Sequence, residues 1–192
     1  MSLTIATAPT ENPISDAEAK AHLRVDHTDD DTFIGTLVDA ATQYLDGPAG
    51  ILGRALVTQT WDLYLDEWPA NAIRIPLAPL ASVTSINYVD ISTEAETGWA
   101  ATNYQVDTHS TIGWAVYASS ANLPTLMDTI NAVRVRFIAG YGAAAAVPAP
   151  IHAAIKLIVG FWYENRGDEV AADPLNIPGV RSLLMPYRVA WS

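Results

Sequence analysis

Two changes in hydrophobic period along the chain set the strongest limit on how it can fold. Between residues 33 and 45, apolar side chains recur at steps of three and four, which is the spacing of a helix with one buried face. From Val57 to Asp66, apolar and polar residues alternate, with Gln59 as the exception, as they do in a strand with one buried face. Helical spacing returns after Pro150. The pattern predicts an α+β fold, with a helical core from both chain ends, a β-rich antiparallel insertion between them, and an extended C-terminal tail.

Two helices are expected before the insertion. The sequence SDAE at residues 15–18 is a capping box, in which the serine caps a helical amide and the glutamate reaches back. A short helix should therefore run from about Asp16 to Arg24. The second helix should open at residues 28–31, where the helix dipole favours carboxylates, and should end at Gly47-Pro48.

A third helix is expected after the insertion. Pro150 suits its first turn, and the helix should end near Arg166-Gly167. Its apolar stripe includes Phe161 and Trp162 and is so wide that the helix should be buried or packed against neighbours. Trp162 is therefore a candidate for core packing or for a contact between subunits.

The insertion is expected to be a small antiparallel sheet or sandwich, because short strand candidates follow one another through turn-rich segments. Besides 57–66, the candidates are residues 73–76, 83–90, 104–107, 111–117 and 132–138. The expected organisation is an N-terminal arm (1–13), a helical core (14–56 with 148–167), the β-rich insertion (57–142) and the C-terminal tail (168–192).

The charge balance is acidic, with 21 Asp and Glu against 10 Lys and Arg and a net charge of −11. Proteins that grip DNA concentrate Lys and Arg on one face, so this balance argues against tight phosphate binding but allows a surface past which DNA slides. The absence of cysteine excludes a disulfide framework, a thiolate zinc site and a catalytic thiol. Neither the opening 13 residues nor the interrupted apolar stretch 143–162 predicts a signal sequence or a membrane span, so we expect a soluble cytoplasmic protein.

The chain lacks the common catalytic motifs: the Gly-x-Ser-x-Gly elbow, the phosphate-binding Gly-x-x-x-x-Gly-Lys loop and the His-Glu-x-x-His pair. The carboxylates at residues 26–31 suggest a calcium loop, but Asp31 and Leu37 stand where such a loop needs Gly and Glu. Capping of the second helix is the favoured interpretation. The four histidines share no metal-ligand spacing. We therefore expect no enzyme, cofactor or metal, with a small hydrolase carrying a carboxylate pair as a less favoured alternative.

Two arginines of the insertion are candidates for a surface that faces DNA. Arg134 and Arg136 share one face of the strand expected at 132–138. On that face they could line a DNA channel. A solvated face or a salt bridge between subunits is the favoured alternative.

Short segments between residues 14 and 188 occur in a recognisable order. They are ISDAEAKAHLRVD (14–26) with Asp30-Asp31, QTWDL (59–63), IPLAPLASV (75–83) with Tyr88, RVRF (134–137) with GYG (140–142), Val147-Pro148, WYENR (162–166), PGVRSLL (178–184) and PYR (186–188). Each segment is weak evidence alone. Their order and spacing together resemble the head–tail connector family of long-tailed phages, a family that also occurs in gene transfer agents.

The resemblance implies a structural adaptor of the virion neck, with no catalytic motif. Such a protein would form a ring with itself, as a dodecamer, below the portal protein of the filled head. It would extend the channel through which double-stranded DNA passes non-specifically, and it would dock the next neck protein, a stopper or tail terminator. No membrane partner is implied. A tail-completion or minor tail protein is the alternative.

The proline-punctuated tail is expected to order when it binds a neighbouring subunit or the portal protein. Its candidate contact residues are apolar anchors and two cations that would seek carboxylates: Leu183, Leu184, Tyr187, Trp191, Arg181 and Arg188. Trp162 on the third helix completes the set. The alternative is a tail that folds back on its own subunit.

Overall fold

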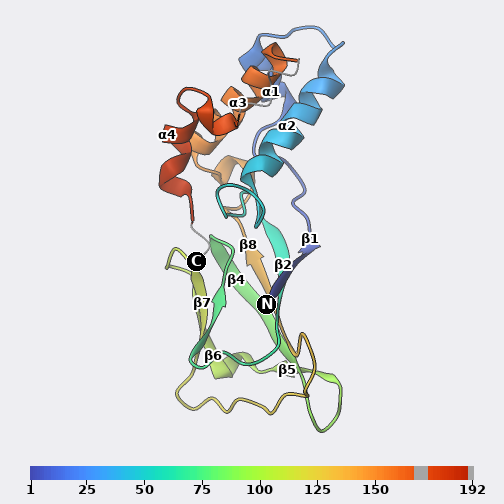
Figure 1. Cartoon of the computed structure of the whole chain (residues 1–192), viewed down its shortest axis with the longest axis vertical. Coiled ribbons are helices and arrows are strands. Elements are labelled where there is room, and N and C mark those ends of the chain that lie inside the picture. Colours follow the sequence, from blue (N-terminus) through green and yellow to red (C-terminus); the bar gives the residue numbers. More distant parts are fainter. Residues whose placement is uncertain (167–172, 190–192) are drawn as a thin grey trace. The chain divides into compact units, whose positions relative to one another are not determined.

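The computed structural model describes residues 1–166 and 173–189, and the chain divides into two compact units. The β unit comprises residues 1–8 and 58–140, and the helical unit comprises residues 9–57 and 141–192. Each unit is built from two segments that are distant in sequence (Figure 1). Helices and antiparallel sheets are both present, so the predicted α+β fold is confirmed.

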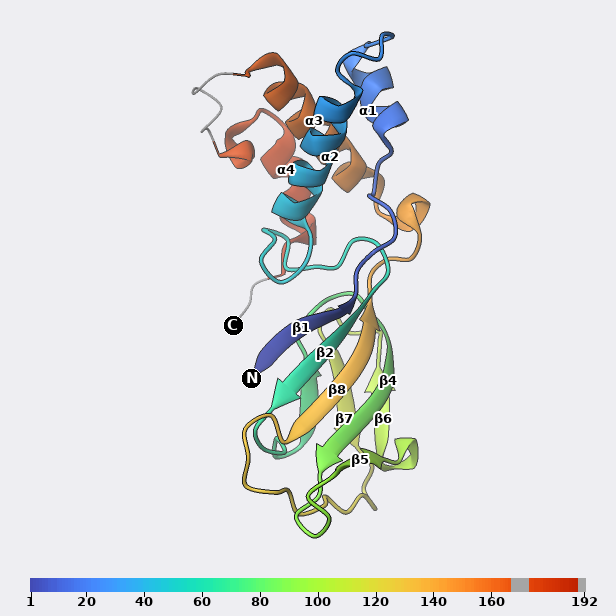
Figure 2. The ribbon, with the colours of Figure 1, turned by 90° about the vertical axis from the view of Figure 1, so that its right-hand side faces the viewer.

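The β unit holds a five-stranded sheet with the order β1-β2-β8-β4-β5 and a three-stranded sheet with the order β3-β7-β6. Every pair of neighbouring strands is antiparallel. The strands are β1 (Ser2–Thr7), β2 (Gln59–Leu65), β3 (Ala72–Ile75), β4 (Leu80–Val89), β5 (Glu96–Trp99), β6 (Tyr104–Asp107), β7 (Gly113–Tyr117) and β8 (Val133–Ala139). Figure 2 shows β8 in the middle of the larger sheet.

The central strand β8 anchors the larger sheet through its buried apolar face. Its buried residues alternate with half-buried ones, as the sequence predicts for a strand with one buried face. Val135 and Phe137 are fully buried, and Leu63 on β2 lies opposite Val135. Arg134 and Arg136 point to the other face of the sheet, where polar side chains gather.

Residues 2–7, expected as part of an extended arm, form the edge strand β1. The strand pairs with β2, with Leu3 opposite Leu63 and Ile5 opposite Trp61. Five of its six residues are exposed. The short strand β5 was likewise not expected, and its first three residues are exposed. Neither strand has the alternation of buried and exposed positions by which strands are found in a sequence.

An aromatic cluster joins distant segments of the β unit. Trp68 and Trp99 have ring centroids 4.9 Å apart, and Tyr117 meets Trp99 edge to face at 5.5 Å. The indole nitrogen of Trp68 donates a hydrogen bond of 3.0 Å to the carbonyl of Pro124. Burial raises the pKa of the Tyr117 hydroxyl to about 12. Trp68 is therefore held within its own unit.

The helical unit contains α1 (Asp16–Leu23), α2 (Asp31–Leu45), α3 (Ala149–Glu164) and the short α4 (Val180–Leu184). The 3-10 turns η2 (Ala144–Ala146), η4 (Pro174–Asn176) and η5 (Met185–Tyr187) join them, whereas η1 (Ala101–Asn103) lies in the β unit. The predicted capping box is confirmed: Glu18 N donates to Ser15 Oγ at 3.2 Å, and Ser15 N donates to the Glu18 carboxylate at 3.0 Å.

One apolar core holds the helical unit together. Fully buried residues recur along α2 and α3 at helical spacing: Ile34, Val38, Ala41 and Leu45 on the first, and Ile151, Ala154, Ile155, Ile158 and Val159 on the second. These stripes match the apolar faces that the sequence predicts. The two helices pack against each other across this core (Figure 1).

The described part of the tail, residues 173–189, does not extend away from the helical unit but folds back on it. Val180 is fully buried and Leu184 is 2% exposed, and both belong to the apolar core. Burying one such side chain stabilises a fold by roughly 1.5–3 kcal/mol, which offsets the entropy of ordering a short segment. The alternative of a tail folded on its own subunit is therefore what residues 173–189 adopt.

Candidate assembly surfaces

Polar contacts at both ends of the described tail add to its apolar anchors. The Tyr44 hydroxyl donates to the Asp173 carboxylate at 2.6 Å, and Val189 N donates to Leu52 O at 2.9 Å. The Arg54 guanidinium donates to the carbonyl of Tyr187. Burial, together with the hydrogen bond to Asp173, raises the pKa of Tyr44, while that hydrogen bond lowers the pKa of Asp173. These contacts hold the segment that carries the predicted contact residues.

The folded tail separates the predicted contact residues into two groups. Leu184 is buried in the core, and Leu183 and Tyr187 are half-buried against it, so much of their apolar surface is used within the subunit. Arg181 and Arg188 are exposed. Trp191 lies outside the described residues. The sequence reasoning missed Met185, which is 52% exposed beside these arginines.

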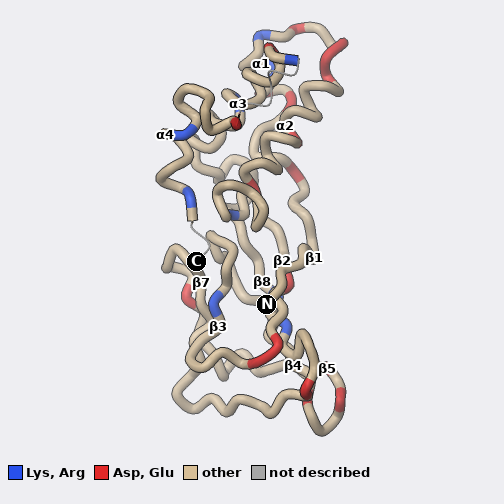
Figure 3. Tube along the Cα trace, in the orientation of Figure 1, with Lys and Arg blue, Asp and Glu red and all other residues tan. Residues whose placement is uncertain are grey.

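Arg181, Met185 and Arg188 form what we call the α4 patch. They border a shallow, almost entirely apolar hollow whose other lining residues are Ile51, Leu52, Leu175 and Leu184. Neither guanidinium makes a hydrogen bond or ion pair with another residue in the described part of the chain. Figure 3 marks cationic residues on and just after α4. The α4 patch thus combines unpaired positive charge with exposed apolar surface.

Trp162 lies on α3 and is half-buried against the apolar core of its own unit. Its neighbour Tyr163 donates a hydrogen bond of 2.5 Å to Asp30, and Arg166 forms an ion pair of 3.0 Å with the same carboxylate. The hydrogen bond from Tyr163 holds the pKa of the Asp30 carboxyl below its usual value, and Arg166 adds to this effect. Trp162 therefore has partners within the subunit.

The acids expected to cap α2 have a different role. Asp30 occupies the N-cap position, but its side chain makes no cap hydrogen bond and binds Tyr163 and Arg166 instead. Asp31 pairs with Lys20 on α1. The carboxylates tie α2 to its neighbours, which sequence spacing alone could not indicate.

A second surface of the helical unit is an acidic hollow of about 610 Å³. Its exposed carboxylates are Glu11, Asp16 and Glu18, and buried Ile14 together with residues 143–145 provides its apolar lining. Glu11 accepts a hydrogen bond of 2.8 Å from Ala144 N, and Glu18 pairs with Lys156 at 3.2 Å. The sequence reasoning missed this site because residues 11–18 and 143–145 are far apart in the chain.

The polar face of the larger sheet in the β unit carries an ion network. Asp62 on β2 is 5% exposed and accepts two hydrogen bonds from Arg136, at 2.8 and 2.7 Å. Arg134 lies 4.0 Å from Asp62 and 2.6 Å from Glu96 on β5. The hydrogen bonds from Arg136 hold the pKa of the Asp62 carboxyl below its usual value. Both candidate channel arginines are therefore paired with carboxylates of their own unit.

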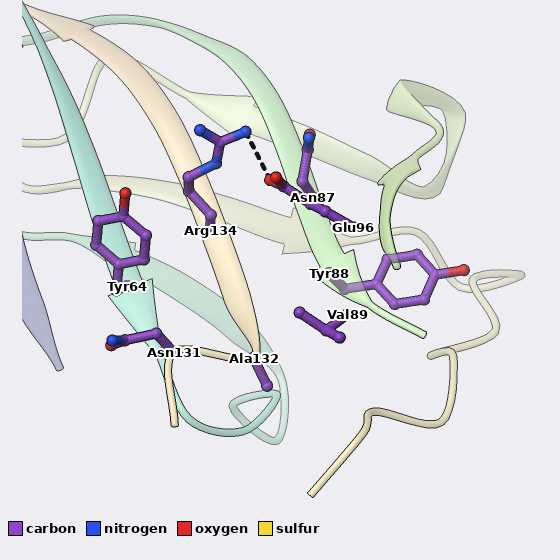
Figure 4. A pocket seen from close by; sticks show the side chains of 8 residues that line it. All are labelled: Tyr64, Asn87, Tyr88, Val89, Glu96, Asn131, Ala132 and Arg134. Carbon is purple, nitrogen blue, oxygen red and sulfur yellow. Dashed lines mark ion pairs between the residues drawn. The ribbon is translucent and has the colours of Figure 1, made fainter. Parts of the chain in front are cut away.

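Beside this network lies a pocket of about 170 Å³, lined in part by Tyr64, Asn87, Tyr88 and Asn131 (Figure 4). Figure 4 shows Arg134 turned toward Glu96 across the pocket. The lining residues do not bring a nucleophile and a base together. Within residues 1–166 and 173–189, no three His, Cys, Asp or Glu side chains are grouped so that they could hold a metal ion.

The helices of the same described residues are short or carry charged side chains. None of the helices there combines the length and the apolar character that crossing a membrane requires.

Comparison with known proteins gives a consistent assignment. Residues 17–134 match the model of the family described as phage gp6-like head–tail connector protein. A chain from the virion of a native gene transfer agent particle is 28% identical with a TM-score of 0.80, and the match covers 100% of this chain and 97% of that one. A search of the curated proteins finds no match.

Two further solved structures are particle necks. Chains from the neck of an empty gene transfer agent particle, computed with C6 symmetry, and of a native one, computed with C12 symmetry, are each 26% identical. Their TM-scores are 0.75 and 0.70, and each match covers 100% of this chain and 97% of the neck chain. This protein belongs to the phage gp6-like head–tail connector family, which is a family of structural connectors and not of enzymes.

Proposed function

We propose that this member of the head–tail connector family forms a closed ring in the neck of a phage or gene transfer agent particle. The ring attaches below the portal protein, extends the DNA channel, and docks the next neck protein, a stopper or tail terminator. The observation that carries the proposal is the similarity, over the whole chain, to chains from necks computed with C6 and C12 symmetry. A dodecamer is compatible with both symmetries.

A passage for DNA is the second part of the proposal. Tight phosphate contacts would slow the movement of DNA, so a channel protein benefits from few free cations. The chain has a net charge of −11, and Arg134 and Arg136 are paired with Asp62 and Glu96. If these arginines face the channel, their positive charge is already balanced.

Docking to the portal protein is the third part. The described tail is folded, so docking does not depend on ordering residues 173–189 from an extended state. The exposed remainder of the predicted contact set, Arg181 and Arg188 together with Met185, is available either to the portal protein or to a neighbouring copy in the ring. Such a surface suits a protein partner that brings carboxylates and apolar side chains.

Light scattering tests the proposed function. The mass of the purified chain is measured alone and after mixing with the portal protein encoded beside it. A stoichiometric ring on the portal is the expected result. If the chain does not bind the portal protein at any salt concentration but binds tail tubes, the proposal is wrong and the tail-completion or minor tail alternative takes its place.

A further inference from the structure

The α4 patch holds two of the three cations of the helical unit that make no ion pair or hydrogen bond with a described residue. The unit has seven Lys and Arg side chains among its described residues. Lys20, Lys156 and Arg166 form ion pairs, and Arg54 donates to a backbone carbonyl. Two of the remaining three, Arg181 and Arg188, lie together at the α4 patch, although the chain as a whole is strongly acidic.

The chemistry of the α4 patch favours a protein partner over DNA. Its centre is an apolar hollow, and Met185 beside it is half exposed. Phosphate-binding surfaces are lined by polar donors and cations, whereas protein interfaces combine an apolar centre with a charged rim. The partner should therefore present apolar surface flanked by carboxylates.

The acidic hollow of the same unit has this complementary chemistry. Glu11 and Asp16 are exposed at its edge and form no ion pair with a described residue, and the alanines at 143–145 supply apolar surface. In Figure 2, α4 lies toward one side of the helical unit, and α1 with the segment around residues 143–146 lies toward the other. Complementary surfaces on opposite sides of one unit can join copies in a chain.

Rotational symmetry requires this kind of arrangement. In a ring with more than two subunits, each copy contacts its neighbours through two different surfaces, one on each side. We propose that the α4 patch of one copy docks into the acidic hollow of the next copy, with Arg181 and Arg188 facing Glu11 and Asp16 and Met185 entering the apolar part. This inference rests on the proposed ring and names its subunit interface.

Site-directed cross-linking tests the contact directly, because the chain has no native cysteine. Met185→Cys and Ala145→Cys place one thiol in the α4 patch and one in the acidic hollow. The double variant is treated with a short bismaleimide, both as the purified ring and in assembled particles. The expected product is a ladder of covalent multimers that extends beyond the dimer. Each single-cysteine variant carries one thiol per subunit and should give no such ladder.

The cross-linking results separate the two proposals. If light scattering shows a ring, or particles contain the chain, and yet the double variant gives no ladder, the ring stands and this interface is wrong. A strong dimer from Met185→Cys alone would show a two-fold contact and would also overturn it. A cross-link from Met185→Cys to a different neck protein, without self-linking, would assign the α4 patch to that protein. If no ring or particle incorporates the chain, both proposals fail together.

Charge substitutions provide a second test with matched controls. Arg181→Glu should weaken ring formation at least about tenfold, since it sets like charges against each other. Arg24→Glu changes the net charge equally at an exposed cation of the same unit and should leave the ring intact. On the other surface, Asp16→Arg should weaken the ring, whereas Asp29→Arg should not.

Combining the two substitutions is the decisive step. A chain that carries both Arg181→Glu and Asp16→Arg regains opposite charges across the proposed contact, so its ring should recover most of the lost stability. Circular dichroism of each variant checks that it is folded. Equal effects of Arg181→Glu and Arg24→Glu, or a double variant weaker than either single one, would overturn the proposal.

Discussion

The two units treat their charged residues in opposite ways. In the β unit, Arg134 and Arg136 are fixed by Asp62 and Glu96 on neighbouring strands, so a line of charges across the sheet is balanced internally. In the helical unit, several ion pairs tie helices together, but the arginines of the α4 patch and two carboxylates of the acidic hollow, Glu11 and Asp16, form no ion pair with a described residue. The difference indicates that the two arginines of the larger sheet are balanced within one subunit, whereas the proposed interface would supply carboxylates to the two arginines of the α4 patch.

The largest expected effect concerns the dependence of the helical unit on its tail. Leu184→Ala removes a side chain that is 2% exposed, and should destabilise this unit by about 3 kcal/mol. Hydrogen exchange followed by mass spectrometry should show faster exchange in α2 and α3, with β8 unchanged. Met185→Ala, at an exposed neighbouring position, should cost less than about 0.5 kcal/mol. Equal loss of protection in β8 would show that the two units unfold together.

The ion network of the β unit should give the next largest effect. Asp62→Ala leaves Arg136 without its carboxylate acceptor and removes a negative charge 4.0 Å from Arg134, and should destabilise the β unit by about 2 kcal/mol. Urea unfolding read from the tryptophans of this unit measures the change. Glu67→Ala, at an exposed acid, is the control and should have little effect. A neutral Asp62→Ala would mean that the network does not stabilise the sheet.

The same carboxylate predicts a pH dependence. The folded pKa of Asp62 lies below its ordinary value of 3.8, so its stabilisation is fully present above that value. The stabilisation is lost as the pH falls through the folded pKa, because protonation removes the charge that Arg136 binds. Asp62→Asn should therefore flatten the loss of β-unit stability below about pH 4. If Asp62→Asn loses stability at low pH as the parent chain does, groups other than Asp62 cause that loss.

A smaller effect is expected at the start of α1. Ser15→Ala removes the side-chain cap on Glu18 N, and should destabilise the helical unit by about 1 kcal/mol. Ser15→Asp keeps a capping oxygen and should retain most of the stability. Thermal unfolding compares the three chains, and an alanine variant as stable as the parent would exclude a role for the capping box.

The smallest effect concerns a single contact of the tail. Tyr44→Phe removes the hydroxyl that binds Asp173, and should cost about 0.5–1 kcal/mol. Limited proteolysis should cut the segment after residue 173 faster, while cleavage within the β unit stays the same. Unaltered cleavage would show that the apolar anchors alone hold the tail.

The elements with strong periodicity could be predicted from the sequence, and the weakly periodic ones could not. Helices α2 and α3 and strands β2 and β8 have one apolar face each, and the apolar residues of each face recur in the sequence at helical or strand spacing. Strand β1 alternates Leu3 and Ile5 with polar residues over only four positions, which is too short a run to identify a strand, and five of its six residues are exposed at the edge of the sheet. Residues 173–189 fold back because Val180 and Leu184 pack into the apolar core of the helical unit. That packing depends on residues distant in sequence, so no local pattern predicts it.

The candidate surfaces were harder to predict from the sequence than the fold, because they depend more on tertiary structure. The sequence indicates that Arg134 and Arg136 share a face, but their partner Asp62 follows only from the register of β2 against β8, in which Asp62 lies opposite Arg136. The resemblance to head–tail connectors indicated the tail as a contact region. It could not separate the buried Leu184 from the exposed Arg181, because that distinction arises when α4 packs on α3.

The position of β8 in the larger sheet has a consequence for synthesis of the chain. This strand is the last of the eight described strands in sequence and yet pairs with both β2 and β4. The central strand of the larger sheet is therefore missing until residue 139 has left the ribosome. The core of the helical unit is completed later still, because α3 and α4 follow β8 in the sequence. A nascent chain therefore carries α1 and α2 before α3 is available to pack against them, and contacts of high sequence separation must close late. Chaperones that shelter apolar segments during translation should bind this protein until its last helices emerge.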